Sequence, residues 1–226
     1  MKKFSNRSLF PFLMGTLALM CFLAVALVLS FSVVPPWGRM LPLILPAVSL
    51  FVIAFMSQKE KLSGRMTVVL TLIASVVLLT ASFFYTVLLC VWTATADVAN
   101  VKYYPKAYSQ IKDGEAVEGI FLEAVPEGAE EVYFHYNAPF LQGGEMFELS
   151  YTASAGELSQ WEDFLESKSE WFGSNEDWHR MNNWGFIGVD STRYQLYWDG
   201  GYNHGEMSYV LIDTTNSRIT FCYEDW

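Results

Sequence analysis

The first 96 residues of the chain contain a single acidic side chain, Glu60. The other 23 Asp and Glu residues lie between 97 and 226, together with seven of the 14 Lys and Arg residues. The net charge is therefore +6 before residue 97 and −16 after residue 96. A domain with this negative charge repels the phosphates of nucleic acid and of anionic lipids. We therefore expect it to bind neither. This change of composition predicts two parts, 1–96 and 97–226.

Cysteine is scarce. Cys21 and Cys90 lie in apolar runs, and Cys222 is the only cysteine of residues 97–226. No disulfide can form within the acidic part, so its stability must come from packing. Its 25 aromatic residues, six of them Trp, favour a packed core over disorder.

Three runs contain no Asp, Glu, Lys, Arg or His: 8–34, 40–56 and 66–96. A helix of about 20 apolar residues crosses a bilayer, so we expect three spans, at about 8–34, 40–56 and 66–93. The second run is at the lower limit of length and contains Pro42 and Pro46, so a re-entrant segment is the alternative. Charged relays are typical of pumps and ion-coupled transporters, and their absence favours a membrane anchor.

Basic residues set the expected orientation, because Lys and Arg are retained in the cytoplasm. Three of them precede residue 8, and three more lie in the connector 57–65. Two crossings between these clusters keep both inside, and the third crossing delivers residues 97–226 to the outside. We therefore expect a multi-pass protein of the cell membrane, with a cytoplasmic N-terminus and an extracytoplasmic domain. The outer domain lacks an Asn-x-Ser/Thr sequon, which is consistent with a bacterial protein.

The acidic part combines strand and helix patterns. Alternating apolar residues predict strands over 117–125, 131–137, 146–153, 194–199, 206–213 and 218–224. Tyr194, Leu196 and Trp198 should share one face of their strand. Residues 97–115 are interpreted as a linker with one helical turn.

Ser154 and Glu157 form a capping box that predicts the start of a helix, with Gly173 as its stop and a short second helix over 174–181. Together these elements predict an α+β domain, with an antiparallel sheet packed on one main helix. With the three spans, the fold expected is a three-helix transmembrane region plus this extracytoplasmic domain.

One pattern carries a resemblance. It comprises Pro126-x-x-Ala129-x-x-Val132, a strand ending in Thr152-Ala153-Ser154, and Leu158-x-x-Trp161-x-x-Phe164. About 40 residues long, it resembles uncharacterised bacterial lipoprotein-like and membrane-anchored outer domains. The resemblance implies a strand–strand–helix unit and no activity.

The candidate metal ligands are His135, His179, His204, Asp199 and Glu206. Histidine and carboxylate ligands suit Zn²⁺, but no His-Glu-x-x-His or Cys-x-x-Cys spacing occurs. Asp199 and Glu206 flank a Gly-rich loop that offers oxygen ligands to Ca²⁺, although a turn explains the same residues. We therefore expect no metal, no cofactor and no catalytic residue.

Three tryptophans, Trp171, Trp178 and Trp184, could line a groove for a peptide or glycan, or fill the core between helix and sheet. The favoured hypothesis is a non-enzymatic binding or accessory domain, held at the bilayer, for another membrane protein or an envelope ligand. A metal-dependent cell-envelope enzyme and a subunit of a larger membrane complex are the alternatives.

Overall fold

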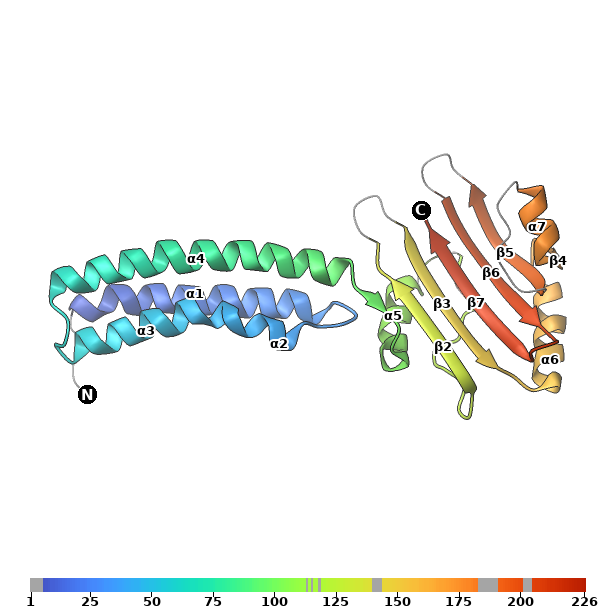
Figure 1. Cartoon of the computed structure of the whole chain (residues 1–226), viewed down its shortest axis with the longest axis horizontal. Helices are drawn as coiled ribbons and strands as arrows, with labels where there is room; N and C mark the ends of the chain where they lie inside the picture. The colour runs from blue at the N-terminus through green and yellow to red at the C-terminus, as the bar shows by residue number, and fades with distance from the viewer. Residues whose placement is uncertain are drawn as a thin grey trace. The chain divides into compact units, whose positions relative to one another are not determined.

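The computed structural model describes residues 6–112, 114, 116–117, 119–139, 144–182, 191–200 and 205–226. The chain divides into two compact units, Met1–Ala94 and Thr95–Trp226 (Figure 1). The first unit is helical and the second contains a sheet.

Three long apolar helical stretches make up the first unit. They are α1 (Asn6–Ser30), the consecutive helices α2 (Trp37–Met40), η1 (Leu41–Ile44) and α3 (Leu45–Gln58), and α4 (Gly64–Ala94). By length and composition each stretch can cross a membrane. The middle stretch spans 22 residues because Pro42 and Pro46 lie in the first turns of η1 and α3, where a missing backbone N–H costs no helical hydrogen bond.

Small and hydroxyl-bearing side chains pack between these helices. Thr67, Thr71 and Ser75 recur every fourth residue on α4 and are buried, and Thr67 Oγ1 lies 3.2 Å from Ser57 Oγ on α3. Many large apolar side chains point outward, such as Val76, 67 % exposed, and Phe83, 64 % exposed. Others, among them Leu29, Leu43 and Leu89, pack between the helices. Such a distribution is typical of helices whose outer surface faces lipid and whose contacts use small residues.

A seven-stranded antiparallel sheet forms the second unit, in the order β1-β2-β3-β7-β6-β5-β4. Its strands are β1 (Asp97–Val98), β2 (Glu130–Asn137), β3 (Glu145–Thr152), β4 (Trp171–Ser174), β5 (Thr192–Gly200), β6 (Gly205–Asp213) and β7 (Arg218–Asp225). The helices are η2 (Val101–Tyr103), α5 (Tyr104–Ile111), α6 (Ala155–Glu166) and α7 (Asn175–Met181).

The hydrophobic core lies on the sheet face that α5 and α6 cover. Tyr104 of α5 contacts the rings of Phe134 and Phe147 at centroid distances of 5.4 and 5.3 Å. On α6, Trp161 packs edge-on against Phe221 at 5.1 Å. The α+β prediction with an antiparallel sheet is confirmed, although two helices rather than one cover the core face.

Half of the predicted capping box is confirmed, since Glu157 N donates to Ser154 Oγ at 3.2 Å. The Glu157 side chain instead accepts from the Tyr151 hydroxyl at 3.1 Å. Gly173 does not end that helix. It lies on strand β4 after a break at residues 167–170.

Two further sequence predictions were wrong. The described part of 117–125 forms turns rather than a strand, and Val117 and Phe121 fill the core with their side chains. Residues 97–115, expected to be a linker, contribute β1, η2 and α5. In both segments apolar side chains pack against a sheet that comes from elsewhere in the chain, which local pattern does not reveal.

The strand β5 departs from simple alternation. Its pairing with β6 shifts register between Gln195 and Tyr197. Tyr194 therefore faces the core opposite Val210, whereas Trp198 lies opposite Met207 on the other face. The prediction that Tyr194 and Trp198 share a face was wrong for this reason.

Candidate functional site

The sheet face opposite α5 and α6 carries two rows of side chains that cross the strands. The pairing registers align Arg193, Leu211, Thr220, Ser150 and Tyr133 in one row. The next row contains Gln195, Tyr209, Cys222, Glu148 and His135. Residues directly opposite one another on antiparallel strands share a face, so these side chains line one surface.

A cavity of about 410 Å³ lies over these rows. It includes Arg193, Tyr209, Leu211, Glu148 and Cys222 in its lining, and its volume falls within the range of small-molecule sites. The short helix α7 follows β4 and brings Asn175 and His179 to the cavity wall. The cavity is therefore walled by the sheet and by one end of this helix.

Arg193 is the most buried cation in the cavity lining, because the whole residue is only 1 % exposed. Its guanidinium carbon lies 3.6 Å from the centroid of the Trp178 ring and 3.5 Å from that of the Tyr209 ring. A planar cation between two aromatic faces gains cation–π attraction while water is excluded. Arg193 thereby joins α7 to β5 and β6.

Neutral groups accept the hydrogen bonds of this guanidinium. Nε and Nη2 donate to Gln195 Oε1 at 2.9 and 2.8 Å, and Nη1 donates to Asn175 Oδ1 at 3.4 Å. None of the ion pairs found within the described ranges involves Arg193. Burial lowers the pKa of Arg193 to about 10, so it stays charged at neutral pH.

Glu224 acts on this cation from further away. Its Oε1 accepts from the Tyr209 hydroxyl at 2.9 Å, and its charge opposes the effect of burial on the Arg193 pKa. The carboxylate is thus bonded to the ring that covers the guanidinium.

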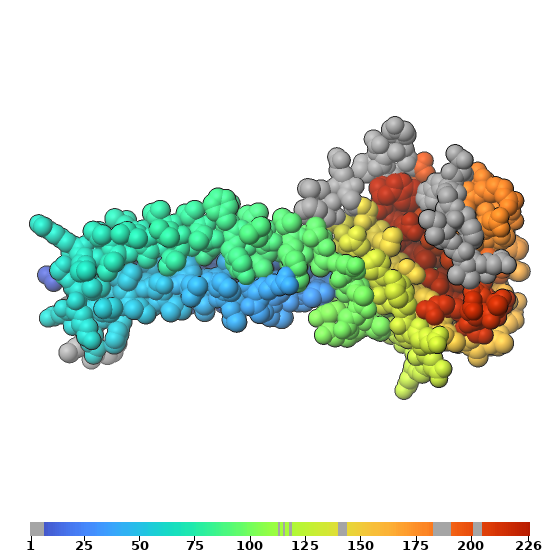
Figure 2. All heavy atoms as spheres, viewed as in Figure 1, coloured from blue at the N-terminus to red at the C-terminus, as the bar shows by residue number. Residues whose placement is uncertain are grey.

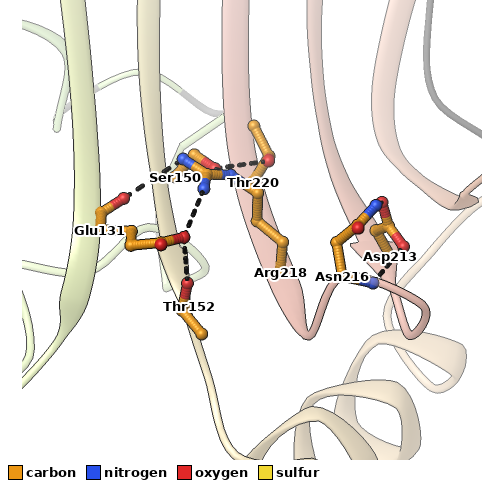
Figure 3. A network of polar contacts seen from close by, with 7 residues as sticks. All are labelled: Glu131, Ser150, Thr152, Asp213, Asn216, Arg218 and Thr220. Carbon is orange, nitrogen blue, oxygen red and sulfur yellow. Dashed lines mark hydrogen bonds and ion pairs between the residues drawn. The ribbon is translucent and has the colours of Figure 1, made fainter.

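The second arginine of the cavity, Arg218, is bonded to neighbouring strands (Figure 3). Its Nε donates to Ser150 Oγ at 2.5 Å, its Nη2 donates to Glu131 O at 3.3 Å, and its Nη1 lies 3.9 Å from Glu131 Oε2. Thr220 Oγ1 lies 3.0 Å from the same Ser150 hydroxyl. Arg218 therefore fastens β7 to β3 and β2.

Asp213, the last residue of β6, is also hydrogen-bonded to a neighbouring residue of the sheet unit. Its two carboxylate oxygens accept from Asn216 N at 2.9 Å and from Asn216 Nδ2 at 2.6 Å, which closes the β6–β7 turn (Figure 3). This end of the cavity consists of groups that hold the sheet together.

Glu148 and Cys222 lie opposite each other in the middle of the face. Burial raises the pKa of Glu148; Glu224 adds to the rise, while His135 and Arg218 oppose it. Burial likewise raises the pKa of the Cys222 thiol, which therefore stays protonated at neutral pH. A protonated buried thiol is a poor nucleophile, so Cys222 contributes apolar surface rather than reactivity.

The histidines proposed as metal ligands lie on different elements. His135, on β2, has its Nε2 2.7 Å from Asp97 Oδ1 of β1. His179 lies on α7, where burial and the nearby Arg193 lower its pKa. His204 falls outside the described residues. Asp199 and Glu206 oppose each other on β5 and β6, and within the described ranges no three His, Cys, Asp or Glu side chains form a group suited to a metal.

The tryptophans proposed as ligand contacts are divided as well. Trp178 is 4 % exposed and packs on Arg193 and edge-on against Trp198, so it fills space between α7 and the sheet. Trp171 lies on β4 with its ring against Gly173, where a Cβ would come within 2.8 Å of the indole. Trp184 lies outside the described residues. A ligand groove made by these three residues stays a prediction.

Sequence reasoning missed Arg193 and Tyr209, which line the cavity, and Gln195, which accepts hydrogen bonds of Arg193. Polar residues at alternating strand positions are typical of a face turned to water, and that interpretation hides a buried polar site. One signal was available: Arg193 is one of only seven basic residues in an acidic part of 130.

Comparison of the chain with family models, with curated proteins and with solved structures finds no match. The interpretation of the site therefore depends on its own geometry.

Proposed function

We propose that the chain is a multi-pass membrane protein whose sheet unit is a non-enzymatic binding domain, with its ligand site in the cavity over β5, β6, β7 and β3. One observation carries the proposal. The face away from the hydrophobic core holds buried polar side chains around a hollow of about 410 Å³. A face that met only water would not need Arg193, Gln195 and Ser150 to be almost fully buried.

The three helical stretches supply the membrane attachment in this proposal. Their outward side chains are apolar, and each stretch is long enough to cross a bilayer. Three crossings place the two ends of the chain on opposite sides. The basic residues before α1 and in the connector to α4 favour a cytoplasmic N-terminus, so the binding domain belongs outside the cytoplasm.

The ligand class expected is a small molecule of the cell envelope. The cavity volume suits one molecule of drug-like size rather than a folded partner. The excess of acidic side chains in this unit disfavours nucleic acid.

A variant that fills the cavity tests this function. Leu211 is half-buried in the cavity lining, so Leu211→Trp should displace a ligand without disturbing the core on the opposite face. We expect native mass spectrometry of the full chain in mild detergent to detect a bound small molecule in the wild type and not in L211W.

Lys168→Trp is the matched control, because it adds the same indole at an exposed position outside the cavity lining. It should keep the wild-type ligand. Identical small-molecule content in wild type and L211W, including none in either, would contradict the proposed function.

A further inference from the structure

We infer that the cavity takes a small organic monoanion, a carboxylate, whose charge is paired with the guanidinium of Arg193. This inference rests on the proposed function, since it names the chemistry of the ligand for the same cavity.

Arg193 has no counter-charge in an ion pair among the described residues. Arg193 is almost completely buried, and its hydrogen bonds go to neutral acceptors, the side-chain amides of Gln195 and Asn175 and the sulfur of Met207. None of the ion pairs that the described residues form includes it. A buried cation is costly unless an anion pairs with it, and aromatic faces and amide dipoles offset only part of that cost. A carboxylate in the adjoining cavity would complete the pair.

The other charged groups around the cavity do not pair with Arg193. Arg218 is bonded to Ser150 and Glu131, and Asp213 is bonded to Asn216. Burial raises the pKa of Glu148, and none of the ion pairs among the described residues joins it to Arg193. Of the two arginines in the described cavity lining, Arg193 is the one without an ion pair, so an anionic group should bind next to it.

The negative charge around the cavity favours a carboxylate over a phosphate as the ligand. Residues 97–226 carry a net charge of −16, and Glu148 and Glu224 lie near the site. Repulsion from these charges acts on a dianion twice as strongly as on a monoanion. Arg218 already has an ion pair, so the described cavity lining offers one guanidinium, which matches a single carboxylate.

A carboxylate can be built into the protein to test the inference without knowing the ligand. Leu211 lies directly opposite Arg193 on the neighbouring strand, with both side chains on the cavity face. Opposite residues have Cβ atoms about 5 Å apart, so a Glu at position 211 can reach toward the guanidinium. Leu211→Gln has the same shape without the charge and is the matched control.

We expect the full chain carrying L211E to unfold at a temperature at least about 3 °C above that of L211Q at pH 7.5, a difference equivalent to roughly 1 kcal/mol in a domain of this size. The difference should persist in 0.5 M salt, because a buried pair is screened weakly. General electrostatics predicts the reverse, since L211E adds a negative charge to an acidic domain. L211E unfolding at or below the temperature of L211Q would overturn the inference.

Small-molecule probes separate the possible outcomes. Benzoate at 10 mM should raise the unfolding temperature of the wild type and of L211Q and leave L211E unchanged, while neutral benzamide should have no effect. Equal shifts from benzoate and benzamide would overturn the anion inference and leave the cavity as a binding site. No benzoate shift would also overturn it, and a larger shift from phenyl phosphate would overturn the choice of carboxylate. The proposed function fails separately, through unchanged small-molecule content in L211W.

Discussion

At the scale of single residues, the open face of the sheet shows how burial changes what a polar side chain does. Arg193 and Arg218 line the same cavity, yet Arg193 is held between two rings and Arg218 is bonded to a carboxylate, a hydroxyl and a backbone carbonyl. The local sequence pattern predicts the same environment for both, because each is an arginine at an alternating position of a strand. Only the neighbouring strands, which come from distant parts of the chain, decide which of them becomes buried.

Glu148 provides a residue-scale prediction with a defined sign. Burial raises its folded-state pKa, so its contribution to stability is complete below the unfolded pKa and is lost as the pH rises through the folded pKa. Glu148→Gln removes that loss. At pH 7.5 we expect E148Q to unfold at a higher temperature than the wild type, and at pH 4 and below the difference should shrink toward zero.

Thermal unfolding of the full chain in detergent, followed across this pH range, measures the effect of E148Q. Glu130→Gln, at an exposed position of β2, reports the general effect of removing one negative charge. If E148Q were less stable than the wild type at pH 7.5, the carboxylate would be making a favourable contact that outweighs its burial.

At the scale of elements, the parts of the fold that could be predicted are those whose signal is local. The strands 131–137, 146–153, 206–213 and 218–224 lie within a few residues of β2, β3, β6 and β7, and the cap of α6 is where its sequence places it. The exceptions have non-local causes. Phe121 packs on Phe147 and Phe221 without joining the sheet, and the bulge in β5 depends on its pairing with β6.

The N-terminus of α6 gives the prediction at this scale. Ser154→Ala removes the side-chain oxygen that accepts from Glu157 N, and the loss of such a cap costs about 1 kcal/mol. We expect denaturant unfolding of the full chain, followed by Trp fluorescence, to show this loss. Ser154→Asp keeps an acceptor and should stay close to the wild type. Equal losses in both variants would mean that another property of Ser154, and not its cap, stabilises the helix.

At the scale of the whole molecule, the chain divides into two compact units, Met1–Ala94 and Thr95–Trp226, whose atoms Figure 2 colours along the chain. The contrast in charge along the chain predicted a division at 96/97, and compactness divides the chain between residues 94 and 95. The cavity could not be predicted in this way, since its lining comes from five strands and α7.

The prediction at this scale concerns which side of the membrane the sheet unit occupies. Thr214 is exposed in the β6–β7 turn, and Lys61 is exposed in the connector between α3 and α4. In intact cells, a membrane-impermeant maleimide should label Thr214→Cys and should leave Lys61→Cys unlabelled until the cells are lysed. The reverse pattern would place the sheet unit in the cytoplasm and contradict the proposed orientation.

The buried thiol on the central strand has a practical consequence. Cys222 lies on β7, which is paired with β3 on one side and β6 on the other, and it is 7 % exposed. Its side chain is part of the cavity lining, so a reagent must enter the cavity to reach the thiol. A molecule bound in the cavity should therefore slow its modification, which makes the native thiol a probe of cavity occupancy in intact membranes, where optical methods are hard to apply.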